Sequence, residues 1–294
     1  MSIPLHQLRR RLETVYTEYN RWEYIHPDPL EFLWRYSSTE DREIVGLIAS
    51  GLAYGRVARI LKSTEKVLEI LGPAPSGFLR EVSLKELSGA FDGFKHRFTT
   101  AFEMAAILKS ASVLQEKWGL LGHMLRAFIS EDTYHNALDR FVRNLLEGAG
   151  MEKCSLLARP SLGSACKRLH LFMRWMVRKD DVDPGGWQWI SPSVLIIPLD
   201  VHMFRAAVAL GFTGRKTASC AAAFEITESF RAINPDDPVK YDFALPVWEY
   251  RVFTRILCSG SCSPGKPGMC NVLRNNQASD TDSADSGAGN RLLD

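Results

Sequence analysis

The sequence has few cysteines for its length, and they follow no regular framework. Six cysteines occur among 294 residues, and Cys154, Cys166 and Cys220 are scattered through the body of the chain. Small disulfide-stabilised domains instead carry many cysteines within a short secreted chain. We therefore expect no disulfide framework, and a reducing compartment fits this composition better than an oxidising one.

The sequence also lacks an excess of one charge and a long apolar run. Its 36 Lys and Arg residues nearly balance its 34 Asp and Glu residues, for a formal net charge of +2. This total neither requires nor excludes a nucleic-acid partner, because such a partner depends on clustered charge. No segment approaches the roughly 20 apolar residues that span a bilayer, and residues 1–16 contain no apolar signal core. We expect a cytoplasmic protein with no membrane contact.

An alternating apolar and polar pattern, typical of a half-buried strand, does not occur over any useful length. The one strand-like run is 195–199, and Pro198 limits it to an isolated extended piece. Apolar residues at helical spacing are common instead, so the fold class is predicted to be all-α. The spacing predicts helices over 4–22, 30–36, 57–71, 101–116, 119–129, 133–147, 167–178, 201–210, 217–234 and 239–257, one from the 37–43 segment to 55, and short turns over 79–90.

Two titratable residues stand at predicted helix starts within the segment 160–211. A glycine-broken turn precedes the helix predicted to begin at Lys167, and an apolar run delivers Asp200 to the start of a later helix. A lysine amine and a carboxylate form a nucleophile pair if the fold brings them together. Asp200 also fits the simpler role of a helix N-cap, because Asp is favoured at that position.

The sequences around these two residues resemble the helix-hairpin-helix DNA glycosylase superfamily. PLDVHMFRAAVALG (198–211) resembles the stretch that carries the catalytic aspartate, to which Asp200 corresponds. RPSLGSACKRLHLF (159–172) resembles the hairpin whose second helix presents the catalytic lysine, to which Lys167 corresponds. The separation of the two, 33 positions, resembles the archaeal 8-oxoguanine DNA glycosylase (AGOG) branch and an uncharacterised bacterial family distantly related to it.

The resemblance implies a two-lobed, all-α glycosylase-like fold with the pair in the cleft between the lobes. One lobe would be the contiguous segment 38–178, which contains the hairpin. The other would combine the N-terminal helices, 1–37, with 198–257. The segment 179–257 as a whole holds an insertion, the helix after Asp200 and the C-terminal helices. Few apolar residues occur in 258–294, so this part is predicted to be a mostly disordered tail.

The implied function is base-excision repair of double-stranded DNA that contains a damaged, oxidised base. Lys167 would attack the sugar C1′ and form a Schiff base, which permits strand cleavage by β-elimination, and Asp200 would stabilise the cationic sugar or move protons. Lys179 is the alternative nucleophile. The resemblance implies a monomer at the nucleoid that needs no cofactor. A catalytically inactive nucleic-acid-binding module and a helical protein-interaction scaffold remain alternative functions.

Further residues are candidates for contacts with DNA and with the extruded base. The hairpin has one glycine where the superfamily has glycines on both sides of an apolar residue. Trp187 and Trp189 are candidates for stacking on the base, with packing in the core as the alternative. The candidates for contacts with the DNA backbone are Gly163, Ser164, His202, Arg205, Arg56, Lys95 and Arg97.

We expect no metal site. The acidic cluster at 180–183 lacks the spacing and the distal glutamate of a calcium loop, so it favours a solvated turn. Cys258, Cys262 and Cys270 lie where the endonuclease III branch carries an iron–sulfur cluster. Such a cluster takes four cysteines, and the spacing here does not match one.

Overall fold

The computed structural model describes residues 4–248, and these are predominantly helical, so the all-α prediction is confirmed. No helix in this part is long and apolar enough to cross a membrane. The α-helices are α1 (Leu5–Tyr19), α2 (Thr39–Gly51), α3 (Val57–Leu71), α4 (Pro75–Glu81), α5 (Leu84–Ala90), α6 (Ala101–Trp118), α7 (Leu121–Glu131), α8 (Tyr134–Gly148), α9 (Lys167–Val177), α10 (Val201–Ala209) and α11 (Cys220–Ile233). The 3-10 helices are η1 (Trp22–Tyr24), η2 (Pro29–Arg35), η3 (Pro160–Leu162) and η4 (Pro192–Val194).

Two differences from the sequence prediction concern extended structure and the C-terminal helix. A small antiparallel hairpin joins β1 (Lys95–His96) to β2 (Thr99–Thr100), although two-residue strands leave no alternating pattern to detect. The run 195–199 joins no sheet. The predicted helix 239–257 lies partly outside the described residues, and within them 244–248 is helical. The predicted tail and the cysteines at 258–270 also lie outside the described residues.

Local capping chemistry explains why several helices begin where they do. Ser83 and Glu86 form a reciprocal capping box at α5, and Thr100 and Glu103 form another at α6. Each box satisfies backbone N–H groups that have no partner within the helix. The second box also ends the β-hairpin, because Thr100 is the last residue of β2. The hairpin is therefore held directly against the start of α6.

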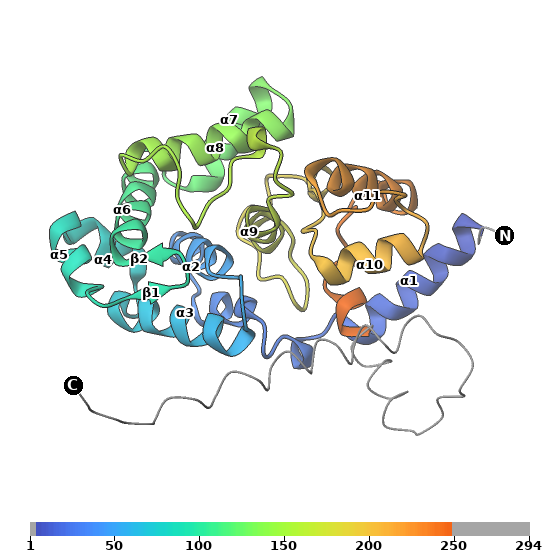
Figure 1. Cartoon of the computed structure of the whole chain (residues 1–294), viewed down its shortest axis with the longest axis horizontal. Helices are drawn as coiled ribbons and strands as arrows, with labels where there is room; N and C mark the ends of the chain where they lie inside the picture. The colour runs from blue at the N-terminus through green and yellow to red at the C-terminus, as the bar shows by residue number, and fades with distance from the viewer. Residues whose placement is uncertain (1–3, 249–294) are drawn as a thin grey trace, which may run out of the picture. The chain divides into compact units, whose positions relative to one another are not determined.

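Helix α9 occupies the middle of the described structure, as Figure 1 shows. Helices α2 to α8 lie on one side of it, and α1, α10 and α11 lie on the other. Phe172 and Trp175 of α9 are buried, and the Phe172 ring meets the Trp187 ring edge-on at 5.3 Å between centroids. The middle of α9 is therefore fixed in a packed core, with the two groups of helices on either side of it.

A buried carboxylate ties α2 to α7 and to the segment after α9. The Glu43 carboxylate accepts hydrogen bonds from the backbone N–H groups of Leu121 and Gly122, at 2.8 and 2.9 Å. It also accepts from Gln115 Nε2 at 2.8 Å and from Trp187 Nε1 at 2.7 Å. Burial raises the pKa of Glu43 in spite of these donors. Four donors thus converge on one side chain from three separate segments.

We predict that Glu43→Ala strongly destabilises the fold. The substitution leaves buried donors without an acceptor and opens a cavity, which together should cost about 3 kcal/mol or more. Urea unfolding followed by tryptophan fluorescence measures the loss, with Glu116→Ala as the control because Glu116 is exposed on α6. Equal stability of the two variants would contradict the role of Glu43.

Candidate functional site

Lys167 is the first residue of α9, and an unusual turn places it there. Gly163 follows η3 with φ +78°, and Cys166 precedes the helix with φ +46°. Glycine takes this left-handed conformation readily, whereas an L-residue such as cysteine takes it at a cost. The backbone therefore adopts the left-handed conformation twice within four residues before α9 begins, and the second of these residues, Cys166, is buried.

Asp200 is the N-cap of α10, and its two carboxylate oxygens have different partners. Oδ1 accepts a hydrogen bond from the backbone N–H of Met203 at 2.8 Å. Oδ2 lies 3.4 Å from Nζ of Lys167. The capping role that the sequence suggests is therefore present, and it leaves one oxygen directed at the lysine.

The Lys167–Asp200 pair is reachable from solvent. The side chains are 36% and 28% exposed. An exposed ion pair of this kind contributes little to stability, because solvent screens it. Chemically, an amine with a carboxylate beside it has the parts of a nucleophile and its proton acceptor. The structure thus brings together the two residues that the sequence selects, and their catalytic roles stay a prediction.

A pocket of about 420 Å³ adjoins Lys167. Its walls come from the segment just after α2, the turn before α9, the first turn of α9 and the residues just before α11. The polar and charged residues among the lining are Tyr54, Ser164, Lys167, Arg168 and Ser219. The pocket is large enough to admit a small planar ring beside the amine, since ligand sites begin at about 300 Å³.

The predicted DNA contacts fall into separate places around this pocket. Gly163 and Ser164 line it. Arg97, at the tip of the β-hairpin, lies with its guanidinium carbon 5.7 Å from the ring centroid of Tyr54, a pocket residue. The remaining candidates are exposed and do not line the pocket: Lys95 on β1, Arg56 at the N-cap of α3, and His202 and Arg205 on α10.

Trp187 and Trp189 do not line the pocket. Trp187 is 0% exposed and donates to Glu43, so it is part of the core and the prediction of a base-stacking role is wrong for it. Trp189 is partly buried, and its ring lies 4.7 Å from that of His123 at the start of α7. The burial of the two indoles depends on residues far away in the sequence, Glu43 for Trp187 and His123 for Trp189. The local sequence around 187–189 does not predict these contacts.

Lys179 lies beyond the other end of α9 from Lys167. Twelve positions along a helix correspond to about 18 Å. Lys179 is exposed there and does not line the pocket. The geometry therefore favours Lys167 over the alternative nucleophile.

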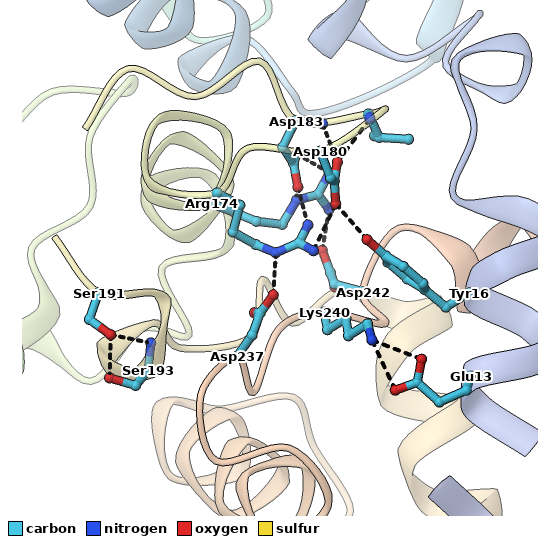
Figure 2. A network of polar contacts seen from close by, with 12 residues as sticks. Glu13, Tyr16, Arg174, Asp180, Asp183, Ser191, Ser193, Asp237, Lys240 and Asp242 are labelled. Atoms are coloured by element: carbon cyan, nitrogen blue, oxygen red, sulfur yellow. Dashed lines mark hydrogen bonds and ion pairs between the residues drawn. The ribbon is translucent and has the colours of Figure 1, made fainter. Parts of the chain in front are cut away.

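A buried network of charges lies behind the pair, and the sequence prediction missed it. The expectation of a solvated turn at 180–183 is wrong for Asp183, which is fully buried. Asp183 accepts from Nε and Nη2 of Arg174, at 3.1 and 3.0 Å, and also pairs with Arg178. Arg178 reaches Asp180 at 2.8 Å and Asp237 at 2.9 Å. Figure 2 shows Arg174 of α9 together with Asp180 and Asp183 from the turn after α9 and Asp237 from the segment after α11.

The network reaches α1 and the segment after α11. Tyr16 of α1 donates to Asp180 at 3.0 Å. Lys240 lies 2.8 Å from Glu13, also on α1, and Figure 2 shows both contacts at the same side of the network. These bonds attach α1 to the segments around α9, which local sequence patterns of α1 alone do not reveal.

Two further buried carboxyl groups, those of Asp242 and Asp28, are influenced by charges of both the network and the Lys167–Asp200 pair. Arg174 pairs with Asp242, which is buried. Burial raises the pKa of Asp242 to about 6, and the negative charges of Asp200 and Asp183 add to the effect, although Arg174 opposes it. Burial also raises the pKa of Asp28, the N-cap of η2, against the nearby charges of Arg174 and Lys167. Asp242 and Asp28 thus hold a proton more tightly than an ordinary aspartate, whereas burial at Asp180 is overcome by the charge of Arg178, which lowers the pKa of that carboxyl.

Among the described residues, no group of three His, Cys, Asp or Glu side chains is arranged to hold a metal ion. Comparison with known proteins gives one match. A family model with the description "Protein of unknown function (DUF2400)" matches residues 28–251. No curated protein and no solved structure matches the chain.

We predict that Asp242 makes the protein less stable as pH rises from 5 to 7.5. Its pKa lies above the ordinary value of 3.8, so the folded state binds the proton more tightly. That contribution to stability is present at low pH and is lost as pH rises through about 6. The loss should be about 1 kcal/mol for this group. Urea unfolding at both pH values, for the wild type and Asp242→Asn, measures it.

Asp139→Asn serves as the control for this measurement. Burial opposes ionisation of Asp139, but its hydrogen bonds with Arg159 and Ser161 lower its pKa to about 2, well outside the window. Asp242→Asn should flatten the pH dependence between pH 5 and 7.5, whereas Asp139→Asn should leave it unchanged. An unaltered slope in Asp242→Asn would contradict the prediction.

Proposed function

The chain belongs to the DUF2400 family, and we propose that it is a DNA glycosylase and AP lyase that acts on a damaged base through Lys167. The observation that carries this proposal is the 3.4 Å separation of Lys167 Nζ and Asp200 Oδ2 at the starts of two helices. The resemblance to helix-hairpin-helix glycosylases selects the same two residues.

The proposed reaction uses the two side chains in sequence. The free amine of Lys167 attacks C1′ of the deoxyribose, the C1′–N bond breaks, and the base leaves with the bonding electrons. Asp200 stabilises the positive charge that develops on the sugar and accepts a proton from the attacking nitrogen. Ring opening gives a Schiff base between Lys167 and C1′. Loss of a proton from C2′ then expels the 3′ phosphate by β-elimination.

The surroundings of the pair support an extruded base as the substrate. A base must leave the duplex before its glycosidic bond can be reached, and a damaged base leaves at lower cost. The pocket beside Lys167 offers about 420 Å³, with the Tyr54 ring in its wall. The placement of α9 between two groups of helices supports the two-lobed glycosylase-like fold. The proposal includes an oxidised base in double-stranded DNA and a monomer at the nucleoid.

The exposed candidates around the pocket support contact with the DNA backbone. Gly163 and Ser164 lie in the turn before Lys167 and line the pocket beside its amine. His202 and Arg205 are exposed on α10, directly after Asp200. Phosphate contacts position DNA without reading its sequence, so such residues suit an enzyme that searches for damage.

We predict that borohydride reduction traps the full-length protein on a duplex that contains an abasic site or an oxidised purine. The covalent adduct should form with the wild type and disappear in Lys167→Ala, because the Schiff-base nitrogen is absent. Lys179→Ala is the matched control and should trap normally. Gel electrophoresis of the adducts measures both.

Asp200→Asn tests the carboxylate with little disturbance to the fold, because asparagine also caps helices. Base release should fall by about 100-fold or more, as for other removed electrostatic or acid–base groups. Unchanged melting temperature together with this loss would support the catalytic role. Failure of every duplex to give an adduct with the wild type would overturn the lyase proposal.

A further inference from the structure

A cluster of arginine and aromatic side chains stands at the β-hairpin, beside the pocket. We call it the Tyr54 cluster, and it comprises Tyr54, Arg59, Arg97, Phe98 and Arg168. Arg59 lies one turn before Ser63 on α3, and Ser63 Oγ is 2.9 Å from His96 Nδ1 of the hairpin. The central ring of the cluster, Tyr54, is held in place because its hydroxyl hydrogen-bonds with His96 O and Thr99 Oγ1, both at 2.8 Å. The hairpin and the pocket wall are therefore joined through one side chain.

Two guanidinium groups lie against the Tyr54 ring. The guanidinium carbon of Arg168 is 4.6 Å from the ring centroid, and that of Arg97 is 5.7 Å away. Arg168 is fixed further, because its Nη1 donates to Gly51 O and Ser155 O at 2.6 Å. A cation over an aromatic face is attracted to it. The ring thus holds two positive charges at the edge of the pocket.

The backbone is shaped to place Arg97. Arg97 has φ +52°, a conformation that non-glycine residues seldom adopt. Beneath it, Gly55 has φ +101°, and a Cβ there would lie 3.2 Å from Arg97 Cδ. The close approach therefore requires glycine at 55. Strained backbone of this kind persists where surrounding structure enforces it, and it is common at binding sites.

The arginines of the cluster have no carboxylate partner among residues 4–248. No ion pair joins Arg59, Arg97 or Arg168 to an acid there. Burial, followed by the charges of these three arginines, lowers the pKa of the neighbouring His96. Positive charges that lie close together repel one another, and a bound anion relieves this repulsion. Such a group of cations therefore attracts anions.

Phe98 completes the cluster and is its most exposed member. It is 73% exposed, and its ring centroid lies 5.7 Å from the Arg97 guanidinium carbon. A large exposed aromatic side chain next to unpaired cations matches the chemistry of an unstacked nucleotide, with phosphates on the cations and a base on the ring. An intact duplex offers its phosphates but not the faces of its bases.

We infer that the Tyr54 cluster binds a single-stranded, unstacked segment of nucleic acid, with phosphates at Arg59 and Arg97 and a base stacked on Phe98. The strand continues past Tyr54 into the pocket beside Lys167. Only this continuation rests on the proposed function, since the cluster does not require that Lys167 be catalytic.

The test is fluorescence anisotropy of the full-length protein with a labelled oligothymidine of about 12 nucleotides. Phe98→Ala should weaken binding about tenfold, or about 1.4 kcal/mol, because stacking is lost. Arg97→Gln should weaken binding and reduce its dependence on salt, because one phosphate contact is lost. Intact duplex should respond to Arg97→Gln but not to Phe98→Ala.

Two matched variants serve as controls. Phe102→Ala removes a phenylalanine that is 54% exposed on α6 and has no ring contact with the cluster. Lys85→Gln removes an exposed cation on α5. Both should bind oligothymidine like the wild type. Equal losses in Phe98→Ala and Phe102→Ala would overturn the inference.

The outcomes separate this inference from the proposed function. Phe98-dependent binding without borohydride trapping supports the cluster and overturns the lyase proposal. Trapping with unchanged oligothymidine binding in Phe98→Ala and Arg97→Gln overturns the cluster and supports the lyase. Absence of both binding and trapping overturns both.

Discussion

The need to pair the two buried arginines at the C-terminal end of α9, Arg174 and its C-cap Arg178, determines much of the structure around the helix. Lys167, Arg174 and Arg178 are seven and eleven positions apart, close to two and three helical turns, so they share one face. Arg174 and Arg178 are buried, and a buried charge is costly unless it is paired. Carboxylates from the turns after α9 and from the segment after α11 meet that need. Segments far apart in sequence are thereby fixed against one helix.

The same face changes character along its length. At the C-terminal end of α9 the pairs are buried and hydrogen-bonded, which makes them structural. At the N-terminal end Lys167 and Asp200 are partly exposed, and their ion pair, with 3.4 Å between Nζ and Oδ2, is open to solvent. Burial raises the pKa of Asp242, which pairs with Arg174 and is also influenced by the charge of Asp200. Reactivity is therefore expected only at the exposed N-terminal end of this face, where Lys167 and Asp200 lie.

The sequence predicts those features that depend on nearby residues. Helix α3 was predicted to its ends because apolar spacing and Gly72 are local signals, and Asp200 was placed at a helix start for the same reason. Burial of Trp187 depends on Glu43, 144 positions away, and no local pattern contains that partner. From the sequence alone Asp183 is predicted to be a solvated acid, because its ion pairs with Arg174 and Arg178 form only in the folded chain. The sequence resemblance is enough to select Lys167. Its 3.4 Å separation from Asp200 can be known only from the three-dimensional structure.

The turn before α9 links the proposed chemistry to the proposed strand contact. Consecutive residues of a helix point about 100° apart. Lys167 therefore faces Asp200, while Arg168 faces Tyr54 on the other side of the pocket. Cys166, with φ +46°, sets the direction of the first turn and so sets both side chains at once. A left-handed cysteine costs free energy, and surrounding structure must enforce it. Here the same short turn directs Lys167 toward Asp200 and Arg168 toward Tyr54.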